Sequence, residues 1–140
     1  MKNLMLVAIL SLAIFGCASQ QEKCASSSPQ SSDDAAVVDG HLAAYNKHDL
    51  EGMLKFFHPE IEAYSSSGEL QRKGLESFRA AFSETFKSSP NEVVVARIIQ
   101  GNRIIDQVDT SFQNGAHVVT ERDTIIYTIE QGLIRKIKFL

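Results

Sequence analysis

The side chains that could do acid–base chemistry are one histidine on an apolar helical face and a few charged residues in alternating segments. His41 lies in a stripe with Val38, Leu42 and Tyr45, at the three- and four-residue spacing of an amphipathic helix. A histidine titrates near pH 6.5, so beside a carboxylate it could act as a general acid or base. A neutral histidine packed in the core is the more common alternative for such a position.

The carboxylates that could serve His41 are Asp106 and Asp123, each within a segment that alternates like a β-strand. Asp123 shares its predicted face with Ile125 and Tyr127, which would place it on the inner side of the sheet. A solvated carboxylate on a strand is the alternative for Asp123.

A hairpin brings a basic residue opposite Asp106. Gly101-Asn102 is a two-residue turn signal between the segments Val93–Gln100 and Arg103–Phe112. If these two residues form the loop, Arg97 stands directly across from Asp106, where opposite charges stabilise a sheet. We hypothesise that this pair faces the interior and presents a polar spot among apolar residues; a structural ion pair on a half-exposed face is the alternative.

The sequence lacks the residue patterns that metal, nucleotide and serine-nucleophile chemistry require. The four histidines show no zinc-type spacing, and the sequence has neither a glycine-rich phosphate loop nor a Gly-x-Ser-x-Gly turn. We therefore expect no metal and no other cofactor. The net charge of −3, with 14 basic and 17 acidic residues and no long basic run, argues against nucleic acid as a partner.

The start of the chain predicts export and lipidation. Lys2 and Asn3 precede an apolar run from Leu4 to Phe15, which is too short for a membrane-spanning helix of about 20 residues and is typical of a secretory signal peptide. The sequence Ile14-Phe15-Gly16-Cys17 resembles the lipobox of bacterial lipoproteins, which implies an acylated Cys17; an ordinary signal peptide with an incidental cysteine is the alternative. By the same resemblance, Ala18 favours the outer membrane, with the protein facing the periplasm.

The chain divides into three segments by composition. Residues 1–16 form the signal peptide, and residues 17–34 form the lipidated cysteine and a serine-rich tether without large apolar side chains. Residues 35–140 form the folded domain. Cys24 has no intramolecular partner once Cys17 is lipidated, so we expect no disulfide.

The folded segment reads as helices followed by strands. Helical stripes surround His41, follow Asp49 and follow Gly74; Asp33 or Asp34 would cap the first helix, and Pro59 would end the second. Residues 60–65 alternate as a first strand, and three hairpin-connected segments follow from Val93 to Leu140. This order predicts an α+β domain with about three N-terminal helices packed on a curved, mainly antiparallel sheet.

Three motifs carry a resemblance to a family. Tyr45–Glu60, Lys73–Glu76 and Ile126–Ile134, in this order and spacing, resemble a SnoaL-like domain of the nuclear transport factor 2-like superfamily over residues 35–140. The resemblance implies a conical half-barrel whose helices enclose a pocket. The superfamily includes isomerases, cyclases, dehydratases, epoxide hydrolases and binding proteins, so the fold alone leaves the activity open.

The ketosteroid isomerases of this fold use a tyrosine, an aspartate base and a protonated aspartate. Aligned with them, this chain carries His41, Ser65 and Ile125, so none of the three groups is present. That triad is therefore excluded.

We predict a domain that binds a small, mainly apolar molecule in its conical pocket. The predicted ligand-binding residues are His41, Tyr45, Phe57, Ser65, Phe78, Phe82, Arg97, Asp106, Asp123 and Tyr127. One alternative is a cofactor-free cyclase, isomerase or hydrolase using His41 with Asp106 or Asp123. The other is a homodimer or interaction module that pairs through Ile98, Ile105 and Ile126 on the outer face of the sheet.

Overall fold

The computed structural model describes residues 29–140 and has the predicted α+β architecture. Helices and strands follow in this order: α1 (Pro29–Asn46), α2 (Leu50–Leu54), β1 (Phe57–Tyr64), β2 (Leu70–Lys73), α3 (Leu75–Thr85), a 3₁₀ turn (Phe86–Ser88), β3 (Asn91–Gln100), β4 (Arg103–Asn114), β5 (His117–Glu130) and β6 (Leu133–Phe139). The predicted signal peptide, Cys17 and most of the predicted tether lie outside the described residues.

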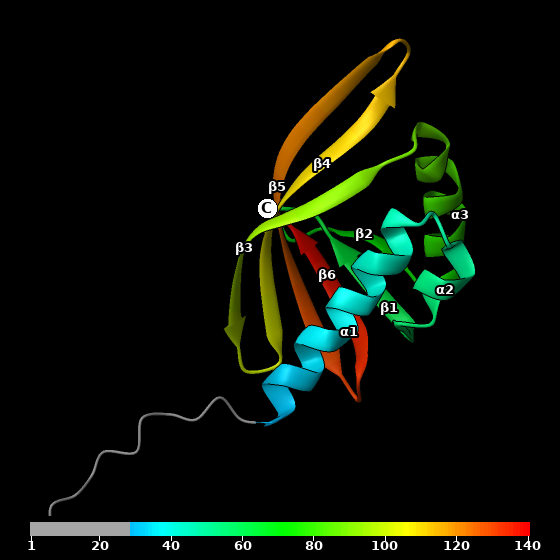
Figure 1. Ribbon diagram of the computed structural model, residues 1–140. Helices are drawn as coiled ribbons and strands as arrows, with labels where there is room; N and C mark the ends of the chain where they lie inside the picture. The colour runs from blue at the N-terminus through cyan, green and yellow to red at the C-terminus, as the bar shows by residue number, and fades with distance from the viewer. Residues whose placement is uncertain (1–28) are drawn as a thin grey trace, which may run out of the picture.

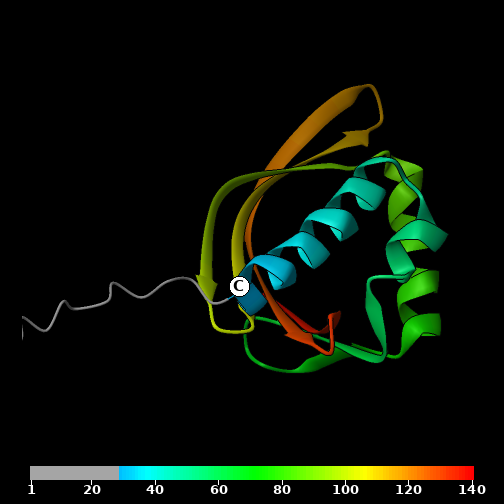
Figure 2. The same cartoon turned by 60° about the horizontal axis from the view of Figure 1, so that its bottom comes forward.

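The strands form one curved sheet of six strands in the order β2-β1-β6-β5-β4-β3. Neighbouring strands are antiparallel except β1 and β6. Helix α1 runs diagonally across the concave face, and α2 and α3 stand along one side of it (Figure 1). Figure 2 shows the sheet curling around α1, which leaves the interior between the helices and the sheet.

The helix boundaries confirm the predicted cap at Asp49 and correct two other predictions, the cap at Asp33 or Asp34 and the helix end at Pro59. Asp49 caps α2, and its side chain accepts a hydrogen bond of 2.9 Å from the backbone N–H of Gly52. Helix α1 already begins at Pro29, so Asp33 and Asp34 lie inside it and do not cap it. Helix α2 ends at Leu54, and Pro59 lies within β1, where the pairing with β6 is interrupted and a missing N–H costs no ladder bond.

The core lies where α1, α2 and α3 meet the concave face. Its most buried side chains include Val38, Met53, Ile61, Ile104 and Ile134. Burial of these apolar side chains fixes α1 across the sheet, because each is worth about 1.5–3 kcal/mol when removed from water.

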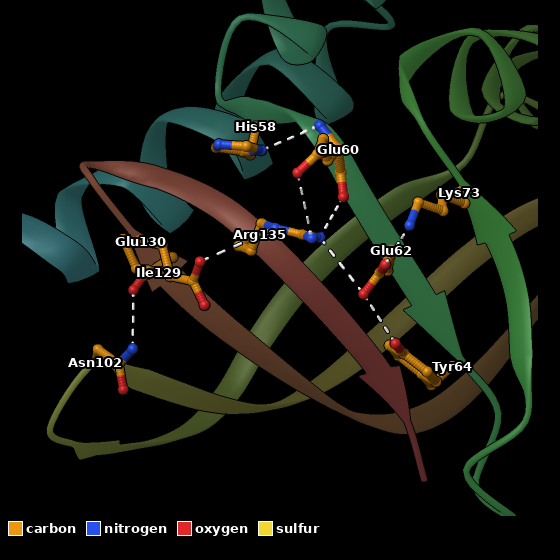
Figure 3. A network of polar contacts seen from close by, with 9 residues as sticks. All are labelled: His58, Glu60, Glu62, Tyr64, Lys73, Asn102, Ile129, Glu130 and Arg135. Atoms are coloured by element: carbon orange, nitrogen blue, oxygen red, sulfur yellow. Dashed lines mark hydrogen bonds and ion pairs between the residues drawn. The ribbon is translucent and has the colours of Figure 1, made fainter.

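A network of charged residues braces the parallel pair of β1 and β6 (Figure 3). Arg135 is an extra residue in β6, and its guanidinium lies 3.4 Å from the carboxylate of Glu62 and 3.9 Å from that of Glu130. Glu62 also accepts hydrogen bonds from Lys73 at 3.0 Å and from the Tyr64 hydroxyl at 2.8 Å. These hydrogen bonds, that of Lys73 foremost, hold the pKa of Glu62 below its usual value.

Among the described residues, no helix is both long enough and apolar enough to cross a membrane.

Candidate functional site

A cavity of about 210 Å³ opens between α1, α3 and the concave face of the sheet. Residues from both helices and from five strands line it: His41, Tyr45, Ala63, Arg72, Phe78, Ala81, Phe82, Thr85, Glu92, Ile125, Tyr127, Ile137 and Phe139. Arg72, Thr85 and Phe139 are exposed, so they form the rim. His41, Phe78 and Tyr127 are buried and form the floor.

Helix α3 supplies one wall of the cavity. Phe78, Ala81, Phe82 and Thr85 line it at the spacing of one helical face. The Phe82 ring meets the Tyr45 ring edge to face, with ring centroids 5.9 Å apart. The wall is therefore mainly aromatic, which suits a flat apolar ligand.

The structure brings five of the ten predicted ligand-binding residues to the cavity. These five are His41, Tyr45, Phe78, Phe82 and Tyr127. Their role in binding stays a prediction.

The other five predicted residues do not line the cavity. Phe57 lies behind it, with its ring centroid 4.9 Å from that of His41. Ser65 belongs to the turn after β1, where its hydroxyl bonds that of Ser67 at 2.7 Å. Asp123 is exposed on β5, and Arg97 and Asp106 bond each other.

The predicted hairpin register is confirmed, and it places Arg97 opposite Asp106. Arg97 donates two hydrogen bonds of 2.7 Å to the two carboxylate oxygens of Asp106, and a third of 2.6 Å to Asp39 on α1. Asp106 is 1% exposed. The pair thus joins α1 to the concave side of the sheet beside the cavity without lining it. It is a buried structural ion pair, which differs from the cavity-facing pair of the hypothesis and from the half-exposed face of the alternative.

His41 is buried on the cavity floor, with 4% of its surface exposed. Burial lowers its pKa to about 4, so the imidazole is neutral near pH 7. Its Nδ1 has no hydrogen-bond partner. No hydrogen bond or ion pair within residues 29–140 joins His41 to Asp106 or Asp123, so the structure does not form the predicted acid–base pair.

Glu92 is the titratable group in the cavity that the sequence analysis missed. An extra residue, Val95, interrupts the pairing of β3 with β4, so that Val94 lies opposite Val108 and Glu92 opposite Thr110. Such a bulge exchanges the two faces of a strand, and it turns Glu92 toward the concave side. Nothing in the alternation of residues 91–100 marks the position of the bulge.

The backbone of Glu92 is held by Asn46 at the end of α1. The Asn46 side chain donates to the Glu92 carbonyl and accepts from the Glu92 N–H, both at 2.8 Å. This two-point contact fixes where β3 begins and so where the Glu92 side chain enters the cavity.

The surroundings of Glu92 favour its protonated form. Burial first, and then the negative charges of Asp123 and Asp106, raise its pKa to about 7, although a hydrogen bond from Thr110 opposes them. Burial also raises the pKa of Tyr45 and Tyr127, so both keep their protons. Neither tyrosine hydroxyl bonds another described residue, which leaves both available to a ligand.

The fold and cavity define a domain of the SnoaL type. The model of the SnoaL-like domain family matches residues 38–137, and the chain belongs to this family. Of the three residues that the sequence analysis aligned with the ketosteroid isomerase triad, His41 and Ile125 line the cavity and Ser65 lies outside it.

Solved structures with this fold come from several bacteria. A candidate SnoaL-like polyketide cyclase from Jannaschia sp. superposes with a TM-score of 0.72 at 13% identity, covering 84% of this chain and 90% of its own. A nuclear-transport-factor-2-like protein of unknown function from Cytophaga hutchinsonii gives 0.64 at 20% identity, with 76% and 88% covered. A candidate ketosteroid isomerase from Kribbella flavida gives 0.66 at 11% identity, with 79% and 78% covered.

No curated protein matches the chain in sequence.

Proposed function

We propose that this domain binds a small, mainly apolar molecule in the cavity between α1, α3 and the sheet. The observation that carries the proposal is a cavity of about 210 Å³ with aromatic walls and a small number of polar groups. An apolar cavity of about 150 Å³ is enough for benzene. The ligand would therefore be the size of one substituted ring.

Native mass spectrometry of the protein, purified as its host processes it, tests this proposal. We expect a copurifying small molecule that is lost on denaturation. The variant Ala81→Trp would fill the cavity and abolish this mass, whereas Ala80→Trp, on the exposed side of the same helix, would retain it. Equal retention in both variants would contradict binding at this site.

A cofactor-free acid–base enzyme is the second candidate, and the position of Glu92 favours it. Glu92 lies in the cavity with two free tyrosine hydroxyls, and a carboxyl whose pKa is about 7 can both donate and accept a proton near neutral pH. This replaces the predicted use of His41 with Asp106 or Asp123. A reaction rate that follows a group titrating near pH 7, and is lost in Glu92→Gln, would support it; an unchanged rate in that variant would contradict it.

We further propose that the chain is a lipoprotein anchored in the outer membrane through Cys17 and facing the periplasm. The lipobox-like sequence supports this proposal, and it lies outside the described residues. Cys17→Ser should release the protein from the membrane fraction. Continued retention would contradict the anchor.

A homodimer or interaction surface is the third candidate. Ile98, Ile105 and Ile126 form one row across β3, β4 and β5, on the face away from α1, and Ile98 is 63% exposed. If the surface pairs two copies, Ile98→Lys should yield monomers in sedimentation experiments. The control Val118→Lys, equally exposed near the tip of the β4–β5 hairpin, should leave the oligomeric state unchanged.

A further inference from the structure

The charges around the cavity are unevenly distributed. Glu92 lines it, and Glu121 and Asp123 on β5 share its side of the sheet, because Glu92, Thr110 and Glu121 form one cross-strand row and Asp123 lies in the next. None of these three carboxylates forms an ion pair or a hydrogen bond with a basic side chain among the described residues. This end of the cavity therefore carries uncompensated negative charge.

The basic residues nearby do not neutralise this end. Arg97 is shared between Asp39 and Asp106, and these three side chains together therefore keep a net negative charge. Arg72 lies on the exposed rim in β2, at the opposite edge of the sheet from β3. Helix α3 contributes no charged side chain to the lining.

The cavity floor adds a second, independent sign of a ligand. The Nδ1 of the buried His41 has no hydrogen-bond partner, although the ring lines the cavity. A neutral imidazole carries one acceptor nitrogen, and because the Nδ1 atom is fully buried, a ligand N–H would reach it only after the ring turns toward the cavity. The hydroxyls of Tyr45 and Tyr127 can accept hydrogen bonds in the same way.

The walls favour an organic cation over a hydrated metal ion. The faces of Tyr45, Phe82 and Tyr127 attract a positive charge and also bury an apolar ring. No three His, Cys, Asp or Glu side chains in the described part of the chain converge as metal ligands would.

We propose that the cavity selects a small primary amine that carries one apolar ring, with its ammonium group against Glu92. This inference rests on the proposed function, because it names the class of ligand that the same cavity takes. The ammonium group would donate to Glu92, with Asp123 adding attraction from the rim side. The ring would pack on Phe78 and Phe82.

Binding of such an amine is linked to the protonation of Glu92. Burial, the charges of Asp123 and Asp106 and the hydrogen bond from Thr110 set this protonation. The other titratable groups around the cavity are His41 and Tyr45 on α1, Arg72 on β2, Arg97 on β3, and Glu121 and Tyr127 on β5. At pH 8 Glu92 is mainly ionised and pairs with the amine, whereas at pH 6 it holds a proton that the amine must displace. The affinity for the amine should therefore fall by about tenfold between pH 8 and pH 6, since a group titrating near pH 7 loses about nine-tenths of its ionised form over that range.

Calorimetric titration with three probes of one shape tests the inference. The probes are 2-phenylethylamine, the neutral 2-phenylethanol and the anionic 3-phenylpropionate, each added to protein purified as its host processes it. At pH 8 we expect the amine to bind at least tenfold more tightly than the alcohol, and the carboxylate to bind most weakly.

Variants of single carboxylates identify the group responsible. Glu92→Gln should weaken amine binding at least tenfold, remove its pH dependence and leave alcohol binding within threefold. Asp123→Asn changes an exposed residue, leaves the core intact, and should weaken only amine binding. The control Glu76→Gln makes the same charge change on the exposed side of α3 and should alter neither ligand.

The outcomes separate this inference from the proposed function. If the alcohol binds as tightly as the amine, or the carboxylate binds best through Arg72, the inference is overturned and the cavity remains a site for apolar ligands. If none of the probes binds at millimolar concentration and no copurifying mass is found, both are overturned.

Discussion

Arg97 and Asp106 face each other across β3 and β4 and share two hydrogen bonds of 2.7 Å. Among the described residues, Arg97 is the only one that hydrogen-bonds the buried Asp106 side chain. The third contact of Arg97, to Asp39, ties the same point of the sheet to α1. Two charges held this way support the wall beside the cavity, because removing one of them would leave the other unpaired in a dry environment.

Asp106→Asn should lower the free energy of unfolding by about 3–5 kcal/mol, the cost of breaking a buried ion pair. Urea denaturation monitored by circular dichroism measures this change. The matched control is Asp109→Asn, which breaks the exposed pair of Asp109 with Arg122 on the same two strands. The control should lose far less stability, and equal losses would show that the burial of Asp106 is not what matters.

Glu92→Gln should make the protein more stable than the wild type, by an amount that grows as the pH rises. The folded protein keeps the Glu92 proton up to about pH 7, whereas the unfolded chain loses it near pH 4.5, so the stability of the wild type falls as the pH rises between these values. The shift corresponds to about 3 kcal/mol. The variant should gain up to this amount over the wild type by pH 8, and nothing at pH 4, in urea denaturation.

The control for this effect is Glu76→Gln, an exposed change of the same charge. It should show no such gain between pH 4 and pH 8. A parallel gain in both variants would assign the effect to net charge instead of the cavity.

His41→Phe should make the protein more stable than the wild type, by an amount that grows as the pH falls. The folded histidine stays neutral down to about pH 4, whereas the unfolded one takes up a proton near pH 6.5, so His41 makes the wild type less stable as the pH falls between these values. The variant removes this loss, so its stability should decline with rising pH between these values through the contribution of Glu92, which His41 offsets in the wild type. Denaturation curves at pH 4.5, 5.5 and 6.5 test this, and a variant profile that runs parallel to that of the wild type would contradict the neutral state of His41.

Asn46→Ala should make the backbone at Glu92 more mobile without changing the Glu92 side chain itself. Losing two hydrogen bonds of 2.8 Å to the Glu92 backbone should cost about 1–3 kcal/mol of stability. The start of β3 would then be freer, and the pKa of Glu92 should move down toward 4.5, as carbon-detected NMR titration of its carboxyl can measure.

Asn102→Ala is the matched control for that variant. It removes a side-chain bond of 2.9 Å to the Ile129 carbonyl at the far end of the same hairpin. It should lower stability and leave the pKa of Glu92 unchanged. A similar pKa change in both variants would mean that general loosening, and not the position of β3, is responsible.

Local signals in the sequence predicted most of the fold. The Gly101-Asn102 turn set the register that pairs Arg97 with Asp106, because a two-residue loop allows one alignment of its strands. The cap at Asp49 and the helix after Gly74 were likewise predicted from the residues next to them in the sequence. β2 was not predicted, since its four residues are all exposed and show no alternation.

The candidate site was predicted where helical periodicity reaches it, and at Tyr127, where the alternation of β5 is undisturbed. His41, Tyr45, Phe78 and Phe82 were found because one face of a helix is readable from spacing alone. In β6 the extra residue Arg135 interrupts the alternation, so that Ile134 and Ile137 are both buried although they lie three positions apart.

The sequence by itself determined the kind of fold, the order of its elements and the pairing of Arg97 with Asp106, since each depends on short-range spacing. Only the tertiary structure decided which carboxylate enters the cavity. Strand alternation has a period of two, so the single extra residue at Val95 reverses every side chain before it and turns Glu92 inward. The contact between Asn46 and Glu92 holds the segment beyond that extra residue, and these two residues are far apart in the chain and meet only once the helix has packed on the sheet.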